Sequence, residues 1–352
     1  MQKVAIIYQS RTPPPINGII KPMKPGGYSD SGADIAYSLK KQNIEVITPT
    51  INPQIDHDLD WVFPDTKEGI QLATAKGANI IWLNTVLYKN HPIEEFIHLG
   101  ISVVGQIPEN VDLYDDKWIT NELLKSNGLP IPKSVMMDQK NKNDFDLNFS
   151  FPVVAKPIRG RGSQGVSLVQ NEYELRDVLN EMFHSNTYGE SLYVEEFLSG
   201  QEVTVTIMPP GKYFINKENI IKNNYWSLPA VKRFNHENGI APYNGKVAIT
   251  NNSEVLQDSE LQSLTIQQLN TACEKAARLV ESKAPIRIDC RANFVGKYFL
   301  FDLNMKPNMT GASRPHRTDQ DSLTALAARK IGWNFDDLIL NMLNNSWCLN
   351  ND

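Results

Sequence analysis

Short apolar runs alternate with segments of helical periodicity along the first third of the chain. The apolar runs have the length of buried strands and lie at residues 4–8, 45–47, 79–83 and 101–104. The helical segments lie between them, at residues 33–41, 67–76 and 93–99. This alternation is typical of a parallel sheet with helices on both faces, so we predict an α/β domain over residues 1–115.

A proline-rich connection joins the first predicted strand to the first predicted helix. Residues 10–30 contain five prolines and include the pair Gly26 and Gly27. Connections of this length are uncommon in compact domains and are often functional. A surface insertion without a role fits the same residues, so the pattern leaves both interpretations open.

The middle of the chain changes to an α+β pattern. A helix is predicted over residues 116–127, where Gly128 and Pro130 end it. A second helix is predicted over residues 172–183. Strands are predicted at residues 153–155, 166–169, 192–197 and 202–207. We therefore predict a small central domain over residues 116–208.

The last third begins with an irregular stretch at residues 209–253. A long helix is predicted over residues 259–282, because Ser259 and Gln262 have the spacing of a capping box. A hairpin follows, and then two helices at residues 321–331 and 335–343. We predict a C-terminal α+β domain over residues 209–352.

Composition narrows the class of protein. Of 352 residues, 41% are apolar and 21% are charged, which is ordinary for a globular chain. A net charge of −5 argues against a generic binder of nucleic acid or of anionic membranes. No apolar run approaches the ~20 residues of a membrane span. The three cysteines lack metal-type spacing and suit a reducing compartment, so we expect a cytoplasmic protein.

A glycine-rich turn between two predicted strands is the first candidate for chemistry. Its glycines, Gly160, Gly162 and Gly165, let the backbone approach a ligand, and their amides can cradle phosphate oxygens. Lys156 ends the preceding strand and Lys117 begins a helix, so two ammonium groups are available nearby. Together these residues favour a nucleotide site, whereas the turn alone fits a structural hairpin.

The hairpin in the last third carries alternating charges. If Val295 and Gly296 form a two-residue turn, Asp289 faces Asp302 and Arg287 faces Asn304. Facing carboxylates repel each other and call for a cation. Asp289, Asp302 and Asn304 offer only oxygen ligands, which suits Mg²⁺. A salt-bridge ladder with the neighbouring arginines is the alternative, and a longer turn would change the register.

Two further segments are candidates for ligand contacts. The linker at residues 195–202 exposes backbone that can read an adenine edge, and Glu202 can accept hydrogen bonds from ribose hydroxyls. An ordinary exposed hairpin is the alternative. The loop at residues 305–317 follows the predicted metal ligands, and its cations could bind a carboxylate unless it is simply a solvated basic loop.

The order of these features resembles the ATP-grasp superfamily, and within it the D-alanine–D-alanine ligase-like branch. The match covers about residues 100–315, and Gly26, Gly27, Tyr28 and Ser29 stand where the family has a Gly-Gly-x-Ser turn. The resemblance implies an α/β N-terminal domain, a central α+β lid and a C-terminal α+β domain with a mostly antiparallel sheet. It further implies an ATP-dependent ligase that makes an acyl phosphate from a carboxylate and converts it to an amide.

The resemblance also implies roles for single residues. The contacts to ATP phosphates come from Lys117, Lys156, Gly160, Gly162, Ser163 and Gly165. The contacts to adenosine come from Glu195, Glu196, Phe197, Leu198 and Glu202. Mg²⁺, with Mn²⁺ as an alternative ion, is held by Asp289, Asp302 and Asn304, and Arg287 stabilises charge at the acyl carbon. The substrate site is expected to include Ser29, Asn308, Ser313 and Arg314.

Four departures from the family pattern stand out. Asp302 replaces a glutamate at the metal, which still allows catalysis. The other three concern the amino-acid pocket: residues 84–89 replace the family's His-Gly-x-x-Gly-Glu-Asp-Gly stretch, Asn308 replaces a glycine, and the proline-rich insertion at residues 10–30 is extra. We therefore expect small amino-acid-like substrates other than two D-alanines, with a D-alanine–D-alanine ligase as the alternative. A nucleotide-binding regulatory protein without catalysis is the hypothesis from another class. A homodimer is compatible with all three.

Overall fold

The computed structural model describes residues 1–16, 18–160, 164–185, 187–236, 239–240 and 249–349. The N-terminal part is a parallel five-stranded sheet in the order β2-β1-β4-β5, with β3 also beside β1. Its strands are β1 (Lys3–Tyr8), β2 (Glu45–Val46), β3 (Val62–Pro64), β4 (Ile80–Asn84) and β5 (Ser102–Val104). Its helices are α1 (Ser29–Lys41), α2 (Lys67–Ala75), α3 (Ile93–His98) and α4 (Pro108–Tyr114). The predicted α/β pattern is confirmed, and β3 and α4 are additional.

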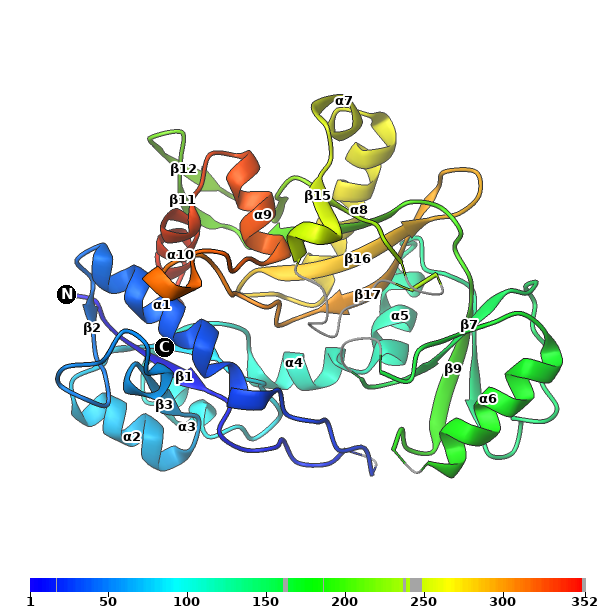
Figure 1. The fold of residues 1–352 in the computed structure, drawn as a ribbon, viewed down its shortest axis with the longest axis horizontal. Coiled ribbons are helices and arrows are strands. Elements are labelled where there is room, and N and C mark those ends of the chain that lie inside the picture. The colour runs from blue at the N-terminus through cyan, green and yellow to red at the C-terminus, as the bar shows by residue number, and fades with distance from the viewer. Residues whose placement is uncertain (17, 161–163, 186, 237–238, 241–248, 350–352) are drawn as a thin grey trace.

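The central part is a four-stranded sheet with a helix against it (Figure 1). The sheet has the order β6-β9-β7-β8, built from β6 (Ser134–Asp138), β7 (Val153–Pro157), β8 (Ser167–Val169) and β9 (Ser191–Glu196). Helix α6 (Glu172–His184) buries Leu175, Leu179 and Phe183 in a core shared with this sheet. Helix α5 (Lys117–Ser126) precedes the sheet, and its N-cap Asp116 accepts a hydrogen bond from the Ile119 amide.

The C-terminal part contains a six-stranded antiparallel sheet in the order β15-β14-β10-β16-β17, with β13 also beside β10. Its strands are β10 (Glu202–Met208), β13 (Trp226–Ser227), β14 (Val231–Arg233), β15 (Ser253–Val255), β16 (Ile286–Ala292) and β17 (Tyr298–Asn304). A separate hairpin consists of β11 (Gly211–Ile215) and β12 (Glu218–Lys222). The helices are α7 (Asp258–Leu261), α8 (Leu264–Leu279), α9 (Leu323–Lys330) and α10 (Phe335–Leu343).

Three predictions in this region need correction. Strand β10 pairs with β14 and β16, so the change of sheet lies between β9 and β10 and not at residue 208. The stretch predicted to be irregular at 209–253 contains the hairpin and three short strands. The predicted long helix is divided into α7 and α8, because Ser263 caps a new helix by accepting from the Ile266 amide.

The N-terminal and C-terminal parts share one hydrophobic core. Ile81 and Val103 of the parallel sheet belong to the same buried cluster as Val205 and Ile288 of the large sheet. The end of the chain adds a second link, since Trp347 forms an antiparallel bridge with Val103. The amide of Trp347 donates to the Val103 carbonyl at 2.9 Å and the indole Nε1 donates to Gly105 at 2.8 Å. The two parts are therefore built as one unit.

Candidate active site

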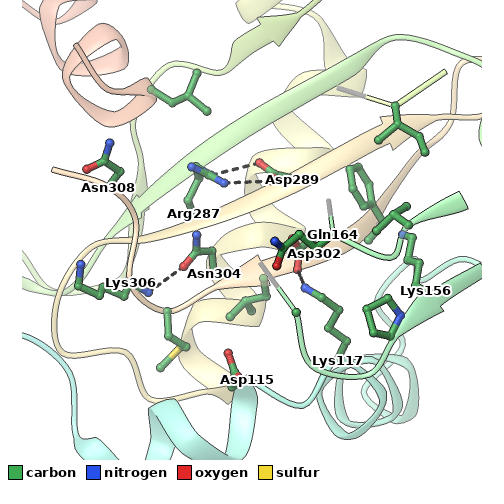
Figure 2. Close-up of a pocket in the computed structure, with 18 of the residues that line it drawn as sticks. Asp115, Lys117, Lys156, Gln164, Arg287, Asp289, Asp302, Asn304, Lys306 and Asn308 are labelled. Atoms are coloured by element: carbon green, nitrogen blue, oxygen red, sulfur yellow. Dashed lines mark hydrogen bonds and ion pairs between the residues drawn. The ribbon is translucent and has the colours of Figure 1, made fainter. Parts of the chain in front are cut away.

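A cavity of about 590 Å³ collects residues from all three parts of the chain. Lys117, Lys156 and Glu195 line it from the central part, and Arg287, Asp289 and Asp302 line it from the large sheet. Lys24 and Tyr28 line it from the connection between β1 and α1. Figure 2 shows Lys117 pointing toward Asp302, with Lys156 on one side and Lys306 and Asn308 on the other.

The β16–β17 hairpin places two carboxylates opposite each other. Asp289 pairs with Asp302 and Arg287 pairs with Asn304, which confirms the predicted register. The turn, however, has three residues at its tip, because the Asn293 amide donates to the Lys297 carbonyl. A bulge at Phe301 compensates for the extra residue, since Cys290 pairs with Leu300. The carboxylates therefore face each other because a longer turn and a bulge cancel.

Asp289 is almost fully buried and is held by two neighbours. The Thr204 hydroxyl on β10 donates to its Oδ1 at 2.7 Å. The Arg287 guanidinium lies on the same strand, with Nη2 at 3.3 Å from the carboxylate Oδ2. A cation and a hydroxyl therefore fix the orientation of this carboxylate toward the cavity (Figure 2).

Asp302 forms an ion pair with Lys117 at the start of α5. Burial raises the pKa of Asp302, but Lys117 together with Lys156 and Arg287 outweighs burial and holds this pKa below its usual range. Burial lowers the pKa of Lys117, but Asp302 together with Asp115 and Asp289 outweighs burial and raises it. Both groups are therefore charged at neutral pH, and a lysine on the central part contacts a carboxylate on the large sheet.

Lys156 and Glu195 form a second ion pair on neighbouring strands β7 and β9. Burial raises the pKa of Glu195 above its usual range, although Lys156 opposes this shift. Glu195 Oε2 is buried and has no hydrogen-bond partner among the described residues. The Lys156 ammonium also lies 4.8 Å from the centre of the Phe301 ring. Among the described residues, Glu195 thus keeps an acceptor oxygen without a hydrogen-bond donor in the wall of the cavity.

The linker after β9 lies along the cavity as predicted. Glu196, Phe197 and Leu198 are lining residues, and Glu202 begins β10 at the same wall. Glu202 is buried and accepts from His236 Nε2 at 2.9 Å, with Arg291 Nη1 at 3.8 Å. The acidic residue predicted to bind ribose is therefore already held in place by two basic side chains.

The glycine-rich turn is described only at its ends. Gly160 and Gln164 line the cavity, whereas Gly162 and Ser163 lie outside the described residues. Gly165 has φ +70°, and a Cβ there would come within 2.6 Å of the Tyr188 ring. A glycine is therefore required where this turn enters β8.

The structure places the predicted substrate residues in two different environments. Asn308 lines the cavity, but Ser29, Ser313 and Arg314 are not among the described lining residues. Arg314 is fully buried, with Nε donating to Asp34 at 2.8 Å. Ser313 donates to the same Asp34 carboxylate at 3.3 Å. This part of the basic loop is therefore paired with α1 in the structure.

Several lining residues have no role predicted from the sequence. Lys21, Lys24 and Tyr28 come from the proline-rich connection, and Asp115 follows α4. The signal in the sequence that could have indicated these residues is the pair of lysines that lies among prolines, just before Gly26 and Gly27. Their contacts with distant residues, such as Lys21 with Asp115, could not be read from the chain order.

The residues fit a magnesium nucleotide. Asp289 and Asp302 converge with the Asn304 amide on one strand pair, which is an oxygen-only donor set suited to Mg²⁺. The buried Glu195 Oε2 suits an amino group of a base, and Lys117 and Lys156 supply positive charge for phosphates. The three predicted metal ligands all line this cavity.

This three-part fold and its cavity define an ATP-grasp enzyme, an ATP-dependent ligase that forms carbon–nitrogen bonds. The family model described as "D-ala D-ala ligase C-terminus" matches residues 123–344, which is more than half of the chain. The chain therefore belongs to the D-alanine–D-alanine ligase family. The predicted superfamily and class of enzyme are confirmed.

Relatives and solved structures agree with this assignment. The D-alanine–D-alanine ligase of Buchnera aphidicola subsp. Schizaphis graminum is 29% identical over 264 residues, covering 71% of this chain and 74% of the relative. That of Francisella philomiragia is 24% identical and covers 71% and 73%. The ATP-complexed D-alanine–D-alanine ligase of Bacillus anthracis has a TM-score of 0.63 at 17% identity, covering 98% and 96%. The VanG D-Ala:D-Ser ligase of Enterococcus faecalis has a TM-score of 0.64 at 16% identity, covering 98% and 99%.

Among the helices of the described residues, none is long and apolar enough to cross a membrane.

Proposed function

We propose that the protein uses ATP to join the carboxylate of one amino-acid-like substrate to the amine of another. The observation that carries this proposal is the convergence of Arg287, the facing pair Asp289 and Asp302, and Lys117 in one cavity. Carboxylates that face each other across a strand pair destabilise it unless a cation compensates. The presence of both carboxylates beside cationic side chains therefore supports a site for phosphoryl transfer.

The proposed reaction has two steps. A carboxylate oxygen of the first substrate attacks the γ-phosphorus of ATP, the bond to the β-phosphate oxygen breaks, and ADP leaves. The amine of the second substrate then attacks the acyl carbon, the bond to the phosphate oxygen breaks, and phosphate leaves. The amine loses its proton as the amide forms. Positioning and electrostatic stabilisation supply most of the catalysis in such transfers.

Each of the cavity side chains has a defined part in this scheme. Lys117 and Lys156 orient the phosphates, and the Glu195 carboxylate accepts from the adenine amino group. Asp289, Asp302 and Asn304 would hold Mg²⁺, which neutralises charge on the transferred phosphoryl group when it is bound. Arg287 stabilises the oxyanion at the acyl carbon, a contribution of about 3 kcal/mol by comparison with other oxyanion donors.

The substrates are proposed to differ from two D-alanines. Ser29 and Ser313, which were expected at the substrate site by resemblance, do not line the cavity. A D-alanine–D-alanine ligase is the second candidate, because the relatives with the most similar sequences carry that name. The use of ATP supports a location in the cytoplasm for either activity.

The proposal is tested by measuring phosphate release with defined pairs of amino acids, with and without Mg²⁺. We expect release that needs Mg²⁺, a carboxylate and an amine, together with an amide product detected by mass spectrometry. The Arg287→Lys variant is a matched control that keeps the charge but changes the donor geometry, and it should bind ATP yet form little amide. Nucleotide binding without turnover across the whole panel would support the regulatory alternative. Activity with D-alanine alone that equals every other pair would support the second candidate.

A further inference from the structure

The connection between β1 and α1 forms one wall of the cavity. Lys21, Pro22, Met23, Lys24, Pro25 and Tyr28 line it, and we refer to residues 18–28 as the strap. Figure 1 shows the segment between β1 and α1 extending far from the N-terminal sheet before it returns to α1. Lys306 and Asn308, from the loop after β17, line the same cavity. The strap therefore places two lysines, Lys21 and Lys24, in the wall of the cavity that Lys306 and Asn308 also line.

Tyr28 is held in a strained conformation that brings two of these cations together. Its φ is +67°, which is uncommon for a residue with a side chain. The preceding Gly27 cannot carry a side chain, because a Cβ there would lie 1.7 Å from the Gln9 carbonyl oxygen. The Gln9 amide donates to the Gly27 carbonyl at 2.9 Å and fixes the strap to the end of β1. Backbone strain of this kind persists where the surroundings enforce it, often at ligand sites.

The Tyr28 ring collects two ammonium groups from different segments. The Lys306 Nζ lies 3.4 Å from the ring centre, and the Lys24 Nζ lies 5.3 Å from it. The quadrupole of an aromatic ring attracts cations, so one ring can hold both lysines at the cavity wall. A cation–π contact leaves the charge of each lysine in place for a ligand.

The carboxylates near the strap are shared with arginines. Lys24 lies 3.2 Å from Asp30, and Asp30 also contacts Arg317 at 3.3 Å. Lys21 forms an ion pair with Asp115, and Asp115 also contacts Arg159 at 3.4 Å. Arg317 also contacts Asp34 at 2.9 Å and Arg159 also contacts Asp112 at 3.3 Å, so Asp30 and Asp115 hold the two strap lysines at the cavity wall in ion pairs that each include an arginine.

We propose that the strap end of the cavity binds the side-chain carboxylate of a dicarboxylic amino-acid substrate of the aspartate or glutamate class. This inference rests on the proposed function and specifies its substrate. Lys24 and Lys306 supply the charge, and Tyr28 positions both. The α-carboxylate or the amine of the same substrate then remains for the reaction near Arg287.

The test compares amino acids that differ only in charge at the side chain. Wild-type kcat/KM is measured with glutamate against glutamine and with aspartate against asparagine, in both stereochemical forms, as donor and as acceptor. We expect an acid-to-amide ratio of at least about 10 in one of these roles, since a charge-assisted contact gives about tenfold or more. Lys24→Met and Lys306→Met should each reduce that ratio about tenfold, whereas Lys140→Met on an exposed loop should leave it unchanged.

If turnover is slow, substrate binding is measured by calorimetry in the presence of an ATP analogue. Glutamate should then bind more tightly than glutamine. Melting temperatures of the variants identify any that fail to fold. An acid-to-amide ratio near one in turnover and in binding, or a ratio that both lysine variants leave unchanged, would overturn the inference while the ligase activity stands. Absence of amide formation with every pair, D-alanine included, would instead reject the proposed function.

Discussion

Asp289 and Asp302 differ in how the surrounding residues hold them. Asp289 is buried and receives a hydroxyl and a guanidinium, whereas Asp302 is paired with Lys117 across two parts of the molecule. Asp289→Asn and Asp302→Asn should each lower Mg²⁺-dependent turnover about 100-fold or more, because each removes charge at the proposed metal. Phosphate release over a range of Mg²⁺ concentrations measures this effect, and circular dichroism verifies that the fold is intact. A variant that remained active but melted much lower would show that the pair is structural.

Glu195 makes the free energy of unfolding depend on pH. Its pKa is raised by burial, so the folded protein binds a proton more tightly than the unfolded chain does. The free energy of unfolding should therefore fall as pH rises from the ordinary glutamate value through the raised folded value. Glu195→Gln should flatten this part of the profile, although it also lowers the absolute stability because it removes the charge partner of Lys156. Urea unfolding at a series of pH values provides the measurement, and parallel profiles for the two proteins would contradict the expectation.

For single residues, the sequence predicted which side chains have suitable chemistry better than it predicted which neighbours surround them in the fold. Alternation placed the charges of the hairpin on one face, but the predicted pairing of Asp289 with Asp302 rested on a two-residue turn and holds only because the bulge at Phe301 cancels the longer turn. The same reasoning failed for Arg314, because the partner that neutralises it, Asp34, lies 280 positions away in the chain. Residue types and spacing therefore indicate which groups can act, while long-range pairing decides which of them are available.

Among the elements, the junction between α4 and α5 connects the two ends of the cavity. Asp115 contacts Lys21 of the strap and Arg159 beside the glycine-rich turn. Asp112 also contacts Arg159, at 3.3 Å. Asp115 therefore links the strap with the segment that leads into the glycine-rich turn.

Asp115→Asn should weaken the binding of ATP and of the amino-acid substrate together, by about three- to tenfold each, since it loosens both contacts. Asp112→Asn is the matched control and should affect ATP more than the substrate. Steady-state KM values for both substrates, with the dissociation constant of ATP, measure the difference. Equal effects of the two variants on the amino-acid substrate would contradict the link through Asp115.

Elements with strong local signals were predicted well, and short strands were not. Helix α10 was predicted with its observed bounds, because its apolar periodicity and the Asn334 cap are both local. Strands β13 and β14 have two and three residues, and they exist because β10 offers them a partner. Such strands depend on a distant neighbour more than on their own sequence.

For the whole molecule, the shared core and the terminal bridge predict cooperative unfolding. Trp347→Ala removes an indole that packs against the core and donates to Gly105, and should lower the free energy of unfolding by about 2 kcal/mol. Leu349→Ala, two positions further on and partly exposed, is the control and should have little effect. Urea unfolding followed by fluorescence and by circular dichroism should give one coincident transition for each protein. Separate transitions would show that the N-terminal part unfolds on its own.

The terminal bridge also affects how the protein folds while it is being made. Strand β5 is synthesised well before Trp347, so its edge receives this partner only after the C-terminal part has been made. During most of synthesis this edge exposes unpaired backbone groups next to buried Val103 and Val104. A nascent chain is therefore most prone to mispairing at β5, and chains that end early lose the segment that closes it.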